Sequence, residues 1–227
     1  MGFGIRVLVE GPRACFTRPE MKAERVSYDV ITPSAARGII EAVYWKPAIR
    51  WQIDRIEVLN EIKFDTFRRN EVGSKISYRN VKAADERGEF LEPIDTNADA
   101  QRMQRSTLYL RDVRYLIDAH FSLTECAGKD DTPEKHYNIV LRRLRKGQHF
   151  MQPALGCREF PAWVTLLEDG DEPPCDGFYA ATEERDLGFM LYDLDFSNSE
   201  SPVPSFYRAV MRHGVIDVAA ARDGVIS

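Results

Sequence analysis

Apolar and polar residues follow strand-like and helix-like patterns over the first 60 residues. A strand is predicted over residues 4–10 and a short extended piece over 26–31. Thr32 and Pro33 are typical of a helix start, with a capping hydroxyl followed by proline at the first helical position. This helix is predicted to run to Trp45, because apolar residues recur at helical spacing: Ala36, Ile39, Ile40 and Val43. Residues 49–59 predict a strand whose alternation slips once.

The pattern weakens between about residues 60 and 105, which predicts an insertion in the fold. Within it, residues 64–72 predict a pair of short strands, and residues 85–99 form an acidic stretch. Segments of this length with little order of their own are usually functional or mobile.

Regular patterns return after the insertion. Residues 106–124 predict a long strand with one slip. Thr132 and Pro133 repeat the helix start, and Gly147 is predicted to close this second helix after Lys146. Its predicted buried residues are Ile139, Val140 and Leu144. The remaining predicted strands cover 162–167, 187–196 and a closing hairpin over 206–218 around His213 and Gly214.

The order of elements is strand, helix, strand, strand, helix, strand, followed by a strand-rich tail. This order is typical of the α+β class with a ferredoxin-like βαββαβ domain. We therefore expect such a domain over residues 1–168, with its insertion at about 60–105, and a small antiparallel β-rich part over 169–227. The RNA-recognition motif shares this order, but many domains of this fold bind no RNA.

Composition places the chain among globular proteins. It is 44% hydrophobic and 30% charged, and no run approaches the roughly 20 apolar residues that a membrane helix needs. Its four cysteines are far apart in sequence, which argues against a zinc site or a disulfide framework: Cys15, Cys126, Cys157 and Cys175. We expect a cytoplasmic protein with no membrane partner.

Charge is segregated along the chain. The net charge is −5, but residues 1–82 carry +5, 83–132 carry −5, 133–158 carry +5 and 159–227 carry −10. A polyanion responds to the local field, which is screened over about 10 Å, so a basic face can exist on an acidic chain. The alternative is that these blocks are solvated faces that pair with each other.

Lys135 and His136 are the residues most suggestive of chemistry. No phosphate-binding loop, serine elbow or H-E-x-x-H motif is present, and no two histidines lie at metal-ligand spacing, so we expect neither a metal nor a cofactor. The alternative left open is a magnesium ion held by carboxylates, which no spacing in the sequence would reveal. Histidine suits general acid–base catalysis near neutral pH, and lysine stabilises a phosphate that gains charge. The alternatives are a partly buried or capping histidine and a solvated lysine in the first helical turn.

Several stretches together resemble one known family. They are Ala14-Cys15-Phe16-Thr17-Arg18-Pro19, Arg25-Val26-Ser27-Tyr28-Asp29-Val30, Glu41-Ala42-Val43-Tyr44-Trp45-Lys46-Pro47, Lys135-His136 in its helix and Leu155-Gly156-Cys157-Arg158-Glu159-Phe160. The chain resembles the CRISPR-associated Cas-five family, in its subtype I-C (Dvulg) branch of the repeat-associated mysterious protein (RAMP) superfamily. The stretches lie in the family's order from the first strand to about residue 160.

This resemblance implies a metal-independent endoribonuclease in antiviral defence. Such proteins cut precursor CRISPR RNA within the repeat, at the base of its hairpin, then hold the 5′ handle in the Cascade complex with backbone and large subunits. The family's catalytic tyrosine matches Tyr44, and its lysine–histidine pair matches Lys135 and His136. The chain departs from the family at Glu134, where a glycine is expected. A non-catalytic binder of the 5′ handle is the main alternative, and duplex DNA is a further candidate partner.

The basic blocks supply candidate RNA contacts, although each residue alone could be an ordinary surface charge. Unpaired bases are expected to stack on aromatic residues such as Phe16, Tyr44 or Trp45. The predicted RNA-binding residues are Arg13, Arg18, Arg68, Arg69, Lys75, Arg142, Arg143, Lys146 and Arg158.

One geometric expectation conflicts with the implied site. If the two helices of the ferredoxin-like domain run parallel, the end of the first and the start of the second are about 15–20 Å apart. Tyr44 then joins Lys135 and His136 only if the second helix is displaced or short. The alternative for Tyr44 is an aromatic residue at the edge of the core, one helical turn after Ile40.

Overall fold

A computed structural model describes residues 3–21, 23–91, 93–97, 101–196 and 202–226. Residues 92, 98 and 99 of the acidic stretch lie outside this set. The helices are α1 (Pro33–Val43), α2 (Tyr78–Arg87), α3 (Pro133–Arg145) and α4 (Val218–Ala221), with a 3₁₀ turn over Arg222–Gly224. The strands are β1 (Gly4–Ala14), β2 (Arg25–Val26), β3 (Ile49–Val58), β4 (Phe64–Val72), β5 (Arg102–Leu123), β6 (Trp163–Leu167), β7 (Arg185–Asp195), β8 (Val203–Met211) and β9 (Val215–Asp217).

The main sheet has the strand order β6-β1-β5-β3-β9, and all neighbours on this path are antiparallel. Its first four strands reproduce the order that a ferredoxin-like βαββαβ domain requires, which confirms the predicted fold class. The slip predicted in the second strand is a β-bulge between Ile53 and Arg55 in β3. Strands β7 and β8 form a separate two-stranded sheet.

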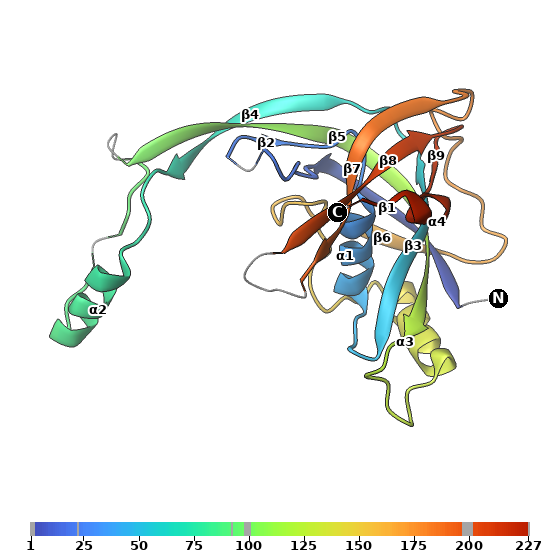
Figure 1. The fold of residues 1–227 in the computed structure, drawn as a ribbon, viewed down its shortest axis with the longest axis horizontal. Helices are drawn as coiled ribbons and strands as arrows, with labels where there is room; N and C mark the ends of the chain where they lie inside the picture. Colours follow the sequence, from blue (N-terminus) through green and yellow to red (C-terminus); the bar gives the residue numbers. More distant parts are fainter. Residues whose placement is uncertain (1–2, 22, 92, 98–100, 197–201, 227) are drawn as a thin grey trace.

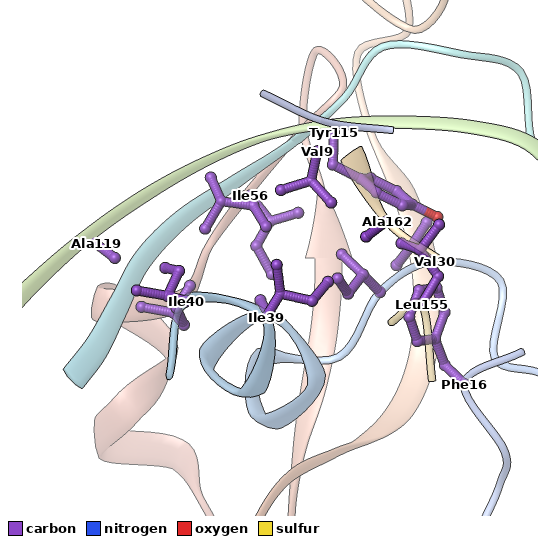
Figure 2. Packing of buried hydrophobic residues seen from close by; sticks show 14 of the residues in the cluster. Val9, Phe16, Val30, Ile39, Ile40, Ile56, Tyr115, Ala119, Leu155 and Ala162 are labelled. Atoms are coloured by element: carbon purple, nitrogen blue, oxygen red, sulfur yellow. The ribbon is translucent and has the colours of Figure 1, made fainter. Parts of the chain in front are cut away.

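Helix α1 covers one face of the main sheet, and the core lies between them (Figure 2). Ile39 and Ile40 of α1 are about 1% exposed and face strand residues such as Val9 and Ile56, which are fully buried. Each such side chain contributes about 1.5–3 kcal/mol through burial. The four residues predicted to form the buried stripe of α1 are all buried, whereas Ile139 in α3 is only half-buried.

The opposite face carries cross-strand ion pairs between β1 and β5. Arg6 Nε lies 2.6 Å from Asp118 Oδ1, and Arg114 Nε lies 2.8 Å from Glu10 Oε2. These residues are also register partners in the sheet. RNA-recognition motifs instead stack bases on aromatic residues of the sheet face. These paired positions therefore offer no stacking platform for a base.

The predicted insertion is a long arm (Figure 1). Strand β4 pairs with the first half of β5, and α2 lies at the far end. The prediction of two short strands over 64–72 is wrong, because this segment is one strand paired with β5. Helix α2 has no buried residue, and the sequence analysis did not predict it. Its ends are nevertheless marked by the cap Ser77 and by Gly88 with φ +67°.

The closing hairpin is only partly as predicted. His213 and Gly214 form the expected turn with φ of 50° and 80°, but β8 meets the following strand only at the Arg212–Val215 bridge. Strand β9 pairs with β3 instead. This pairing adds a strand to the main sheet and buries Ile216.

The predicted division of the chain into two parts at residue 168 stays a prediction. No helix within the described ranges is long and apolar enough to cross a membrane.

A tight loop after α3 is fastened to the end of β1. The Cys15 N–H donates to Leu155 O at 3.0 Å, and the Leu155 N–H donates to Phe160 O at 2.8 Å. Gly156 has φ +86°, and a Cβ there would lie 2.0 Å from Cys15 O. Glycine is therefore required both by the left-handed backbone and by the close approach.

We predict that Gly156→Ala destabilises the protein by about 3 kcal/mol, the sum of left-handed strain and overpacking. Gly188→Ala is the matched control, because Gly188 has φ +73° but nothing within 4 Å of the added Cβ. The control should lose only about 1–2 kcal/mol. Urea unfolding of both variants measures the difference, and equal losses would show that the close approach to Cys15 contributes nothing.

Candidate active site

The C-terminal end of α1 meets the N-terminal turn of α3. The expected separation of about 15–20 Å is wrong, because Tyr44 Oη lies 2.7 Å from His136 Nδ1. The error is in the assumed direction of the helices. β1 and β5 are antiparallel, and each helix returns against the strand that it follows, so α1 and α3 also run in opposite directions. The end of one and the start of the other then lie at the same end of the sheet.

Tyr44 is placed by a network of bonds to the last carbonyls of α1. The helix ends at Val43 rather than at the predicted Trp45, and Tyr44 is extended with φ −152° and ψ 119°. The Trp51 indole donates to Tyr44 O at 2.9 Å, and Arg143 Nη1 donates to Val43 O at 2.7 Å. The Arg143 guanidinium also lies 5.1 Å from the centre of the Tyr44 ring. These bonds satisfy carbonyls that no helical N–H can reach.

His136 is held on both sides of its ring. Its Nδ1 bonds to Tyr44, while Asp131 Oδ1 lies 3.3 Å from Nε2. Nε2 makes no hydrogen bond within the described residues, so the Asp131 contact is an ion-pair distance without hydrogen-bond geometry. The side chains of Tyr44 and His136 are each 2% exposed. The protein therefore encloses this pair.

Lys135 lies beside the pair and faces outward. Its Nζ is 3.0 Å from Asp130 O and 3.4 Å from Asp131 Oδ1, and its side chain is 48% exposed. Thr132 caps the start of α3, as predicted, by accepting a hydrogen bond from the Lys135 N–H at 3.3 Å. One carboxylate oxygen of Asp131 thus lies between the lysine and the histidine.

Electrostatics favour a neutral tyrosine and an ionised aspartate at this site. Burial raises the pKa of Tyr44 above its usual value, although the Arg143 guanidinium partly offsets the effect. The pKa of Asp131 is lowered, first by the Gly128 N–H that bonds its carboxylate and then by Lys135 and His136. Tyr44 can therefore donate a hydrogen bond at neutral pH but is a poor base.

The predicted RNA-binding residues divide into separate groups. Arg142 in α3 and Lys146, the residue after this helix, are exposed. Neither side chain has a hydrogen bond or ion pair within the described residues, whereas Arg143 is bound to the end of α1. Arg68 and Lys75 are exposed on the arm, and Arg158 is exposed in the loop after α3. The fold therefore does not gather all nine predicted residues around Tyr44 and His136.

The remaining three residues of that set lie near the base of the arm and have partners in the protein. Arg69 Nη1 lies 2.7 Å from Glu159, which ties the arm to the loop after α3. Arg18 is 3.5 Å from Asp29, and the Arg13 guanidinium lies 5.7 Å from the centre of the Tyr109 ring. Arg69 is thus engaged in holding the fold, while Arg13 remains exposed.

Asp131 and Trp51 are site residues that the sequence analysis missed. In the sequence, Trp51 is one more apolar position of a predicted strand. The partner of its indole N–H can be known only once the end of α1 is known. Asp131 directly precedes the Thr132 cap, where an acidic residue normally indicates only a helix start. Within the described part of the chain, no group of three or more His, Cys, Asp or Glu side chains could hold a metal ion.

The fold is that of a ferredoxin-like protein in which Tyr44 and His136 meet where α1 ends and α3 begins. The model of the family described as CRISPR-associated protein (Cas_Cas5), in its Cas5d form, matches residues 4–219. The chain belongs to this family.

Two curated relatives support this assignment. The chain is 50% identical over 214 residues to the "CRISPR pre-crRNA endoribonuclease Cas5d" of Mannheimia succiniciproducens, covering 94% of each chain. It is 38% identical over 235 residues to the protein of the same name from Thermus thermophilus, covering 96% of this chain and 92% of that one.

Solved structures share the fold. "Crystal Structure of CRISPR-associated Protein" matches with a TM-score of 0.70 and 27% identity, covering 99% of this chain and 96% of the other. A chain of a "CRISPR RNA-guided surveillance complex" matches with a TM-score of 0.52 and 15% identity, covering 91% and 88%. The second likeness concerns the fold alone.

We predict that Tyr44→Phe makes stability less sensitive to high pH. In the wild type, the raised pKa of folded Tyr44 means that the unfolded chain loses this proton first. Stability that depends on neutral Tyr44 is therefore present below about pH 10 and is lost as pH rises further. Urea unfolding between pH 8 and 11 should give a shallower decline for Tyr44→Phe.

Tyr78→Phe is the control for this measurement, because Tyr78 is 80% exposed on α2. Its decline with pH should match that of the wild type. A Tyr44→Phe profile identical to the control would show that Tyr44 is not titrated differently in the folded protein.

Proposed function

We propose that this protein is an endoribonuclease that cuts precursor CRISPR RNA within its repeat. The observation that carries the proposal is the bond between Tyr44 Oη and His136 Nδ1, with Lys135 next to it in the same helical turn. The names of the curated relatives support the activity. Residue types suited to proton transfer and to phosphate charge are thus placed together by two separate helices.

The reaction that these residues suit is attack by a ribose 2′-OH on its own phosphodiester. It leaves a 2′,3′-cyclic phosphate and a 5′-OH, and it requires one proton to be removed and one to be supplied. His136 is the proposed acid–base group, and Lys135 stabilises the charge that develops on the phosphorus oxygens. These groups provide the catalytic functions from side chains, so we propose that the reaction is independent of metal.

Tyr44 is proposed to hold the imidazole from its Nδ1 side, so that Nε2 faces the phosphate. Its hydroxyl can donate to an unprotonated Nδ1 or accept from a protonated one, because a phenol is both a donor and an acceptor. When Nδ1 is protonated and donates to Tyr44, this bond persists while Nε2 loses or gains a proton. The raised pKa of Tyr44 keeps this hydroxyl protonated at neutral pH.

The rival proposal is a non-catalytic protein that binds the 5′ handle of the RNA. The burial of His136, whose side chain is 2% exposed, favours it. Under this alternative, the Tyr44–His136 bond only joins α1 to α3. The two proposals differ in what loss of the imidazole does, since a structural bond affects stability while a catalytic group affects cleavage.

We further propose that the protein recognises the repeat hairpin and keeps the 5′ handle as a subunit of a type I-C Cascade complex, beside backbone and large subunits. The family and the fold shared with a chain of a surveillance complex support this assembly. Four free cysteines are consistent with the reducing cytoplasm as its location. Duplex DNA is a proposed secondary partner, which competition against repeat RNA would test.

We predict a single metal-independent cut in the repeat. Labelled repeat RNA incubated with the protein in EDTA should be cleaved once, and His136→Ala and Lys135→Ala should each lower the rate by at least about 100-fold while hairpin binding is retained. A 2′-deoxy nucleotide 5′ to the cut should abolish the reaction. Tight binding without cleavage by the wild type would support the handle-binding alternative, and cleavage of the 2′-deoxy substrate would contradict the mechanism.

We also predict that RNA binding weakens steeply with salt. Each phosphate contact contributes about one to the slope of log K against log salt, so Arg142→Ala and Lys146→Ala should each reduce the slope by about one. Arg145→Ala is the control in the same helix, because both of its bonds to Glu168 are 2.7 Å long. Equal slopes for all three variants would show that the exposed end of α3 does not contact RNA.

A further inference from the structure

The carboxylate of Asp131 lies between the side chains of Lys135 and His136 in the proposed site. Its Oδ1 is 3.3 Å from His136 Nε2 and 3.4 Å from Lys135 Nζ. Its other oxygen, Oδ2, accepts from the Gly128 N–H at 3.0 Å. One carboxylate oxygen thus occupies the space between these two side chains. The proposed reaction assigns the same space to a phosphate oxygen.

Each ring nitrogen of His136 is faced by one polar side chain, so access to either nitrogen requires that side chain to move. The ring is 2% exposed, with Tyr44 on Nδ1 and Asp131 beside Nε2. The Tyr44 contact is a 2.7 Å hydrogen bond, and Tyr44 is itself fixed by Trp51 and Arg143. The Asp131 contact lacks hydrogen-bond geometry, and Asp131 belongs to the loop between β5 and α3. Asp131 is therefore the group that a substrate can displace.

We propose that Asp131 occupies the position of the scissile phosphate, and that RNA enters the site by exchanging its phosphate for this carboxylate. The proposal rests on the proposed function, since it assigns the phosphate to the space between Lys135 and His136. Both anions carry a negative charge and present oxygen acceptors, so the exchange leaves Lys135 and His136 with an anionic partner before and after binding.

Asp131 then acts as a competitor for the substrate rather than as a member of the reacting set. Removing its charge should tighten binding of the phosphate and leave the rate of the chemical step intact. If Asp131 instead oriented His136 during the reaction, removing its charge would slow catalysis at saturating RNA. These opposite effects make the two roles separable by experiment.

The experiment compares Asp131→Asn with the wild type in binding and in cleavage. Asparagine keeps an oxygen that can accept from the Gly128 N–H, so the loop turn is retained while the charge is removed. Asp131→Ser serves the same purpose if the asparagine variant fails to fold. Binding is measured with repeat RNA that carries a 2′-deoxy nucleotide 5′ to the cut, so that cleavage does not interfere.

Asp130→Asn is the matched control. Asp130 is the preceding residue and is exposed, and its carboxylate makes no hydrogen bond or ion pair within the described residues. Only its backbone carbonyl contacts Lys135, and that contact survives the substitution. The control removes the same charge from the same loop, so it reports the general electrostatic effect on RNA binding.

We expect Asp131→Asn to tighten binding about two- to fivefold more than the control does, the range that a partly exposed ion pair supports. Its kcat should be unchanged or raised, with KM lowered. Equal tightening by both variants would overturn the proposal, because the effect would then be general. A tenfold or greater fall in kcat would also overturn it and would make Asp131 a positioning residue.

Failure of the inference is distinguishable from failure of the proposed function. If the wild type does not cut ordinary repeat RNA, the proposed endoribonuclease activity fails, whatever the variants bind. If the wild type cuts and Asp131→Asn binds no tighter than Asp130→Asn, the activity stands and only the assignment of Asp131 fails.

Discussion

The antiparallel pairing of β1 with β5 is the constraint on which the rest of the structure depends. Because the two strands run in opposite directions, the helices that return from them also oppose each other. The last residues of α1 therefore meet the first turn of α3, where Tyr44 and His136 form their bond. Neither helix carries the site alone. A phenol without a partner or a histidine in a first helical turn would be unremarkable on any surface.

Hydrogen bonds to the carbonyls at the end of α1 fix the geometry of the contact between α1 and α3. The Phe150 and Met151 N–H groups both donate to Ala42 O, at 2.8 and 3.1 Å. The next two carbonyls along the chain accept from Arg143 and Trp51. These donors come from β3, from α3 and from the segment after α3. Tyr44 is consequently oriented by three parts of the chain, and its hydroxyl needs little reorganisation to hold the imidazole.

Sequence patterns were sufficient for the fold but not for the contacts within the site. The caps Thr32 and Thr132, the bulge in β3 and the buried stripe of α1 follow from local chemistry, which residues close in sequence determine. The resemblance indicated Tyr44 with His136, yet their proximity depends on relative helix direction, which was taken as parallel. Asp131 was missed because its role depends on side chains that meet only after folding. The arm helix α2 was missed because it buries nothing.

Strand β5 has 22 residues and is about 70 Å long, since a strand rises about 3.3 Å per residue. Its first half belongs to the arm, while its second half pairs with β1 and β3 and carries Phe121, whose ring packs against His136. The registers of the two halves are set by different partners. Residues added or removed at the tip of the arm therefore change its reach without shifting any pair in the second half. The length of the arm and the geometry of the candidate site can therefore change independently, although one strand, β5, runs through both parts of the chain (Figure 1).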